Sequence, residues 1–72
     1  MTRSEKHDAA LARTREALAK PMTTREAADA LGTTIPTVVA HIQELERRGV
    51  VFKKTQVRLS FHGGLATRYQ AT

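Results

Sequence analysis

The stretch of sequence that decides the fold covers residues 23–49 and reads TTREAADALGTTIPTVVAHIQELERRG. Thr23 and Glu26 have the spacing of a capping box, in which each side chain satisfies a free N–H group at the start of a helix. Gly32 follows Leu31 at the place where a helix commonly ends in a left-handed residue. The sequence therefore predicts a helix that starts after Thr23, runs to Leu31 and is ended by Gly32.

A second helix is predicted three residues further on, and it ends at Gly49. Thr34 is its expected cap, and Pro36 lies in the first turn, where the missing N–H group of proline leaves no hydrogen bond unmade. Apolar side chains recur at helical spacing within it and form one stripe that we expect to face the core, namely Val38, Ile42 and Leu45. The two helices and their short turn form a helix-turn-helix pattern.

The segment before this stretch is predicted to be another helix, over residues 4–20. Thr2 and Glu5 again have the spacing of a capping box, and Ser4 is an alternative cap. Pro21 is expected to end this helix, because proline disfavours helical geometry at the residue before it and lacks an N–H group.

The segment after the stretch changes its hydrophobic period from 3.6 to 2. Apolar side chains that alternate with polar ones predict a half-buried strand, namely Val57, Leu59 and Phe61. Residues 62–65 read HGGL, which is typical of a hairpin turn, and residues 66–71 return as the partner strand with Tyr69 facing the core. Residues 53–56 fit a strand, a bulge or a turn. The predicted fold is mainly α, with three helices followed by a two-stranded hairpin.

Length and composition limit the classes of protein to which the chain can belong. Its 72 residues are expected to form a single domain over residues 1–72, with little volume for an enclosed active site, so we expect no enzyme. The absence of cysteine excludes disulfides and Cys-type zinc sites, the three histidines lack ligand spacing, and no motif indicates a cofactor. No apolar run approaches the ~20 residues of a membrane span, so a cytoplasmic protein is expected.

The charge of the chain points to an anionic partner. The formal net charge is +5, and residues 49–72 carry four basic side chains and no acidic one. Residues 21–48, in contrast, carry a net charge of −1. A basic surplus gathered in one segment is typical of proteins that bind nucleic acid.

The whole pattern resembles the DNA-binding domain of small prokaryotic winged helix-turn-helix transcription regulators, such as the MarR, ArsR and IclR families. The resemblance rests on the small Ala28, on Gly32 in the turn, and on the run from His41 to Val50, which ends as those families do. Residues 63–69, which read GGLATRY, resemble the wing and its return strand, so the wing is expected over about residues 50–72. The resemblance covers about residues 10–72.

The resemblance implies double-stranded DNA as the partner, with the helix over about residues 34–48 in the major groove and the wing on the phosphate backbone. On a helical wheel, Pro36, Thr37, Ala40 and Glu44 lie opposite the apolar stripe, with His41 and Gln43 at the edges of that side. These residues except Glu44, together with the cap residue Thr34, form the first set of candidate DNA-binding residues. That set is Thr34, Pro36, Thr37, Ala40, His41 and Gln43. The wing supplies Lys53, Lys54, Arg58, His62, Gly63 and Arg68. Val39 and Ala40 stand where the families often have Ser and Arg, so no arginine in the first two turns can contact guanine.

Other interpretations fit the same residues. Ile35, Val39 and Ala40 are apolar, so the same helix could dock on a protein partner instead of DNA. The chain could be a free-standing regulator or the DNA-binding domain of a larger one. A homodimer would form through the first helix, and no small-molecule ligand is evident from the sequence.

Overall fold

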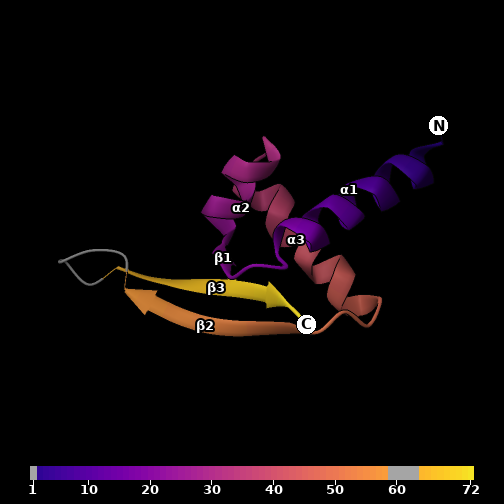
Figure 1. Cartoon of the computed structure of the whole chain (residues 1–72). Coiled ribbons are helices and arrows are strands. Elements are labelled where there is room, and N and C mark those ends of the chain that lie inside the picture. The colour runs from indigo at the N-terminus through magenta and orange to yellow at the C-terminus, as the bar shows by residue number, and fades with distance from the viewer. Residues whose placement is uncertain (1, 59–63) are drawn as a thin grey trace.

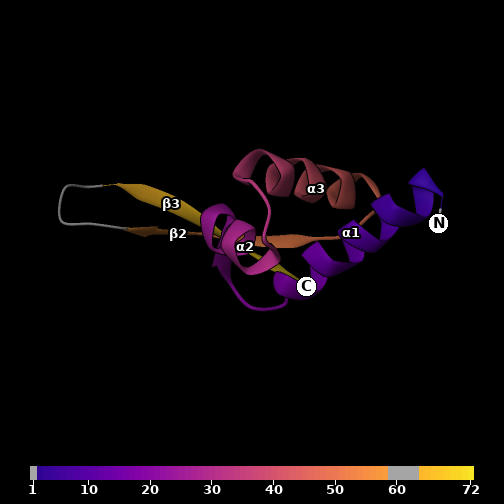
Figure 2. The ribbon, with the colours of Figure 1, turned by 90° about the horizontal axis from the view of Figure 1, so that it is seen from above.

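The computed structural model describes residues 2–58 and 64–72, which form three helices and a three-stranded antiparallel sheet. The helices lie together on one face of the sheet, and the hairpin of β2 and β3 projects beyond them (Figure 1). Seen from above, α1 and α3 lie next to each other, and α2 lies toward the hairpin (Figure 2). The elements are α1 Arg3–Ala17, β1 Met22–Thr23, α2 Thr24–Leu31, α3 Ile35–Arg47, β2 Phe52–Arg58 and β3 Leu65–Ala71.

The predicted helix starts are confirmed. Thr2 caps α1 and Thr23 caps α2, each in a complete capping box with Glu5 or Glu26. At α2 the two bonds are short: the Thr23 N–H group donates to Glu26 Oε1 at 3.0 Å, and the Glu26 N–H group donates to Thr23 Oγ1 at 3.1 Å. Hydrogen bonding to the carboxylate, first from the backbone N–H group of Thr23 and then from its side chain, lowers the pKa of Glu26, because it favours the charged form.

The end of α1 differs from the prediction. The helix stops at Ala17, with Leu18 as its cap, rather than continuing to residue 20. The carbonyl oxygen of Leu18 accepts a hydrogen bond from the N–H group of Ala71 at 2.8 Å. The chain therefore leaves the helix to meet the last strand, and Pro21 follows a turn that has already begun.

Two glycines give the turns their shape. Gly32 ends α2 with a φ angle of 65°, and Gly49 follows α3 with a φ angle of 96°. L-residues with a side chain rarely adopt such angles, whereas glycine does so without steric strain. The prediction that Gly32 ends its helix in the left-handed conformation is confirmed.

The sheet has three strands rather than the expected two, in the order β1-β3-β2. The short strand β1 pairs with β3 through Met22 opposite Tyr69 and Thr23 opposite Arg68. The ambiguous residues 53–56 are strand, because β2 begins at Phe52 and runs to Arg58. Leu59 and Phe61, on which the alternation partly rested, lie outside the described residues.

The core lies between the helices and the helix-facing side of the sheet. The predicted stripe of α3 is buried, with exposed fractions of 5% or less, and packs with Ala27 and Ala28 of α2. Phe52 and the partly buried Tyr69 close the core from the sheet, with their rings edge-on at 6.5 Å. The small side chain of Ala28 is 3% exposed, as expected where α2 and α3 meet. Within the part of the chain that the structure describes, no helix is long and apolar enough to cross a membrane.

Candidate nucleic-acid interface

The outward side of α3 is formed by four side chains that face away from the core: Pro36, Ala40, Gln43 and Arg47. All four are exposed, and none is acidic. Because the buried stripe fixes the rotation of the helix, this outward side is fixed as well. It offers an apolar surface at its start, an amide at Gln43 and a guanidinium at Arg47.

Thr34 lies at the start of this side and serves the helix itself. Its hydroxyl accepts a hydrogen bond from the N–H group of Thr37 at 3.4 Å. The two hydroxyl oxygens of Thr34 and Thr37 lie 2.8 Å apart. Thr34 is exposed, so its hydroxyl remains within reach of a ligand that approaches the N-terminus of α3.

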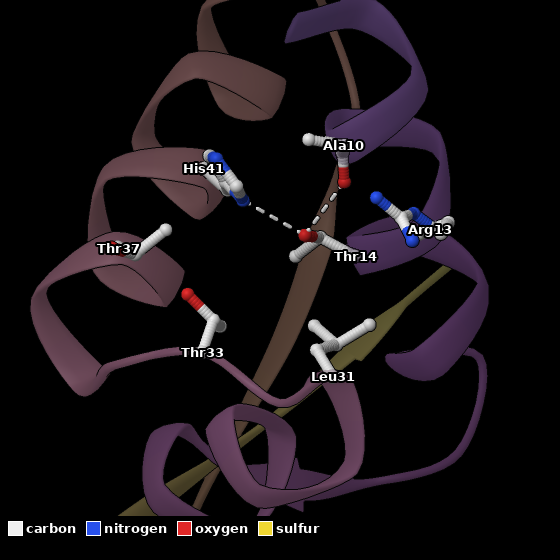
Figure 3. Close-up of a pocket in the computed structure, with 7 residues that line it drawn as sticks. All are labelled: Ala10, Arg13, Thr14, Leu31, Thr33, Thr37 and His41. Carbon is white, nitrogen blue, oxygen red and sulfur yellow. Dashed lines mark hydrogen bonds between the residues drawn. The ribbon is translucent and has the colours of Figure 1, made fainter. Parts of the chain in front are cut away.

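Thr37 and His41 do not lie on the outward side, contrary to the helical-wheel prediction. Both are only partly exposed and face α1 (Figure 3). His41 Nδ1 lies 2.9 Å from the hydroxyl oxygen of Thr14, which in turn donates to the carbonyl oxygen of Ala10 at 2.9 Å. The prediction was wrong here because the wheel treated both flanks of the apolar stripe alike, whereas α1 covers one of them.

The surroundings of His41 favour its neutral form. Burial lowers the pKa of His41, and the nearby His7 lowers it further, with the two rings edge-on at 6.0 Å. The Thr14 hydroxyl has a single proton, which it gives to Ala10, so the Nδ1–H group of His41 donates to Thr14. His41 is therefore a link between helices.

Together these groups line a hollow of about 300 Å³ between α1 and α3, which we call the α1–α3 hollow (Figure 3). Its lining comes from α1, from the end of α2 and the turn after it, and from α3. The residues are Ala10, Arg13, Thr14, Leu31, Thr33, Thr37 and His41. Arg13, Thr14 and Thr33 were not predicted as site residues. The position of Thr14 inside a helix gives no sign in the sequence that its hydroxyl contacts His41, 27 residues further along the chain.

Glu44 is also drawn to the α1 side, although the wheel placed it opposite the core. It is partly buried and pairs with Arg48 at 3.3 Å and with Arg47 at 3.3 Å. Arg48 continues the network to Asp8 of α1 at 2.9 Å. The acidic side chain thus stands beside the outward side of α3, where these arginines partly neutralise it.

The basic side chains of the hairpin are divided between the two faces of the sheet. Opposite residues in an antiparallel pair share a face, and neighbours along a strand alternate. Lys54 lies opposite the partly buried Tyr69, on the side that packs against the helices, and Arg58 shares that side. Lys53 and Arg68 lie on the other side, where Arg68 is opposite Thr55. The hairpin therefore carries cations on both of its faces.

These four cations also differ in whether they are paired. Lys54 lies 3.6 Å from Glu46 of α3 and stands over the ring of Tyr69 at 6.0 Å from its centre. Among the described residues, Lys53, Arg58 and Arg68 form no ion pair. The predicted wing residues His62 and Gly63 lie outside the described residues.

A second hollow lies between the start of α2, α3 and the hairpin, and we call it the α2–hairpin hollow. Its volume is about 650 Å³, and Val39 and Leu65 contribute to its walls. Leu65 is 65% exposed, and Val39 is 38% exposed. Val39, one of the apolar side chains that the sequence analysis offered for a protein contact, thus lines this hollow together with residues of the hairpin.

Comparisons with known proteins supply no relative. No family model matches the chain, and neither the curated proteins nor the solved structures contain a significant match to it.

Proposed function

We propose that this chain binds double-stranded DNA as a winged helix-turn-helix protein and acts as a transcription regulator. The observation that carries the proposal is the arrangement of α3 and the hairpin. An exposed, acid-free side of α3 runs along one flank of the molecule, and a basic two-stranded ribbon projects beyond the helices (Figure 2). A helix of this width fits the major groove, and a two-stranded ribbon fits a groove as well.

In this proposal α3 reads the major groove through its outward side. Gln43 is the exposed side chain best suited to a base edge, because an amide can both donate to and accept from adenine. Pro36 and Ala40 offer apolar contacts to thymine methyl groups. His41 holds α3 against α1 through Thr14, and Thr37 bonds to Thr34 at the start of α3, so in this proposal both position the outward side rather than contact bases.

The hairpin supplies the electrostatic part of the binding. A ribbon that enters a groove has a phosphate backbone on each side, and this chain carries cations on both faces of the ribbon. Arg58 lies at the outer end of β2 and has no acidic partner among the described residues. We therefore assign Arg58 the main phosphate contact of the wing, with Lys53 and Arg68 on the opposite face.

Fluorescence anisotropy with a labelled mixed-sequence duplex tests this proposal. We expect saturable binding that weakens steeply between low and moderate salt, because counterions are released when cations meet phosphates. A single strand of the same length is the control for groove recognition. A folded protein that shows no salt-dependent binding to the duplex would contradict the proposal.

A second candidate function is a contact with another protein. The observation that favours it is the α2–hairpin hollow, whose walls include the exposed apolar side chains of Val39 and Leu65. Ile35, 43% exposed, extends the apolar surface of α3. If the anisotropy titration fails while the protein is folded, this surface becomes the leading candidate interface.

A further inference from the structure

The outer edge of β2 has no strand beside it. The sheet order is β1-β3-β2, so β2 pairs with β3 on one side only, and β2 is exposed over most of its length. The hairpin carries this edge beyond the helices (Figure 1). A free edge of this kind presents backbone N–H and C=O groups to which a further strand can be added.

The hydrogen bonds at the end of β3 fix which backbone groups point to this edge. In an antiparallel pair, residues that bond to the neighbouring strand alternate with residues whose groups point away from it. The N–H group of Thr72 donates to the carbonyl oxygen of Val51 at 3.0 Å, so these two residues form a bonded pair. The N–H group of Ala71 points away from β2, because it donates to the carbonyl oxygen of Leu18 at 2.8 Å.

The register then identifies the outward groups of β2. Every second residue from Val51 onward bonds to β3, so the residues between them turn their N–H and C=O groups to the open edge. The exposed residues of this kind are Lys54, Gln56 and Arg58. Each offers one donor and one acceptor, and within the part of the chain that the structure describes these groups have no partner on this side.

The side chains beside the edge are basic on both faces of the hairpin. Lys53 lies on one face, and Lys54 and Arg58 lie on the other. Among the described residues, Lys53 and Arg58 form no ion pair, and neither β2 nor β3 contains an acidic residue. Such an edge repels a second copy of this chain, whereas opposite charges on neighbouring strands attract.

We propose that the open edge of β2 binds an extended acidic segment of a partner protein as a fourth strand of the sheet. The backbone of the partner pairs with Lys54, Gln56 and Arg58, and its carboxylates meet Lys53 and Arg58. DNA phosphates can accept from the N–H groups of the edge but cannot donate to its carbonyl oxygens, so the edge fits a polypeptide.

This surface differs from the two interfaces proposed above. It lies across the sheet from β1 and from the α2–hairpin hollow, because β3 separates β2 from β1. It also differs from the DNA contact, which uses side chains rather than backbone groups. The inference does not rest on DNA binding, although both partners would use the cations of the hairpin.

A nuclear magnetic resonance titration of the free chain with a blocked peptide of sequence EVTVEE tests the proposal. In antiparallel pairing, the first glutamate lies opposite Arg58 and the last lies opposite Lys53. We expect saturable shifts of the β2 amide signals and slower hydrogen exchange at the N–H groups of Lys54, Gln56 and Arg58. The peptide KVTVKK, which reverses the charge, should not bind measurably.

Two N-methylated forms of the acidic peptide separate backbone pairing from charge attraction. The third and fifth residues turn their N–H groups to β2, so methylation there should weaken binding by about tenfold or more. The second and fourth residues turn theirs away, so methylation there should leave binding nearly unchanged. Both forms keep the full charge of the parent peptide.

Two matched variants of the protein place the contact on the hairpin. Arg58→Gln should weaken the acidic peptide by about two- to fivefold, the effect of an exposed ion pair. Arg15→Gln removes an exposed charge on α1 and should leave peptide binding unchanged.

Four results would overturn the proposal. Equal binding of the two methylated peptides would mean that charge alone attracts the segment, and binding of KVTVKK would mean that no acid is recognised. An absence of saturable shifts would mean that the edge takes no such segment. Concentration-dependent protection of the same N–H groups in the chain alone would assign the edge to a second copy. Each result is independent of the proposed DNA binding, because no DNA is present.

Discussion

His41 of α3 is hydrogen-bonded to Thr14 of α1, with 2.9 Å between His41 Nδ1 and Thr14 Oγ1. Thr14 is 1% exposed, which makes it one of the most completely buried side chains of the protein. Its hydroxyl donates a hydrogen bond to the carbonyl oxygen of Ala10. The orientation of α3 relative to α1 therefore depends on a histidine that donates from Nδ1.

The lowered pKa of His41 predicts that the free energy of unfolding decreases as the pH falls. Burial is the larger cause that lowers the pKa of His41 below its ordinary value of 6.5, and electrostatic repulsion from His7 is the smaller one. The unfolded chain therefore binds more protons between the two pKa values, so the stability contribution is complete above about pH 6.5 and is lost as the pH falls through the folded-state pKa. Urea unfolding followed by circular dichroism, at several values from about pH 7.5 to about pH 5, measures this slope.

His41→Asn is the matched variant for that measurement. Asparagine keeps a hydrogen-bond donor for Thr14 but does not titrate in this range. We expect a flatter dependence of the unfolding free energy on pH than in the parent protein. Identical slopes for the two proteins would show that His41 is not the group responsible.

Ala28→Leu should destabilise the domain by about 1–3 kcal/mol, because extra methyl groups force a close-packed core apart. Ala28 is 3% exposed and lies in the core with Val38 of α3. Ala30→Leu, at an exposed position of the same helix, is the control and should change stability little. Thermal unfolding compares the two variants, and equal melting temperatures would mean that Ala28 does not limit the approach of the helices.

Gly32→Ala should destabilise the turn by about 1–2 kcal/mol, because a side chain disfavours the left-handed conformation. The φ angle of Gly32 is 65°, and no atom of another residue lies within 4 Å of the position that its Cβ would occupy. The strain is therefore purely conformational. Gly32→Asn should cost less, because asparagine adopts this conformation more readily. Chemical unfolding gives the free energy of unfolding of both variants. Equal losses of this free energy for alanine and asparagine would contradict this account.

The predicted contact of Arg58 with phosphate can be measured as a change in salt dependence. Arg58→Gln should reduce the slope of log K against log[salt] by about one, because one phosphate contact is lost. Lys54 and Glu46 already pair at 3.6 Å, so the double variant Lys54→Gln and Glu46→Gln keeps the net charge and should change the slope less. An unchanged slope for Arg58→Gln would remove Arg58 from the interface.

Gln43 should contribute to sequence preference more than to overall affinity. Gln43→Ala removes the exposed amide from the outward side of α3, and a good pair of hydrogen bonds to a base is worth about 1–3 kcal/mol. Once a preferred duplex has been selected, competition against a scrambled duplex gives the ratio of the two affinities. We expect that ratio to fall while binding to the scrambled duplex stays nearly constant. Equal losses on both duplexes would place Gln43 on the phosphate backbone or away from DNA.

The helices could be predicted from the sequence because their determinants are local. The capping box of Thr23 and Glu26, the glycine at position 32 and the stripe around Val38 each act within a few residues. The strand β1 could not be predicted in this way. It consists of two residues, Met22 and Thr23, and it exists only through pairing with a strand at the other end of the chain.

The candidate site was only partly predictable for a related reason. Pro36, Ala40 and Gln43 are exposed as expected, since the apolar stripe defines the opposite side of the helix. The positions of Thr37 and His41 depend on where α1 packs, which helical periodicity does not specify. The division of the wing cations between two faces depends likewise on strand register, which becomes known only when Lys54 is placed opposite Tyr69.

The central claim, that α3 and the hairpin bind double-stranded DNA, is tested most directly by mapping backbone amide signals during titration with a mixed-sequence duplex. We predict that the largest shifts fall on the outward side of α3, around Ala40 and Gln43, and on the hairpin around Arg58. Amides on the exposed side of α1, such as that of Ala12, should change little. Shifts confined to α1, or no shifts in a folded protein, would contradict the account.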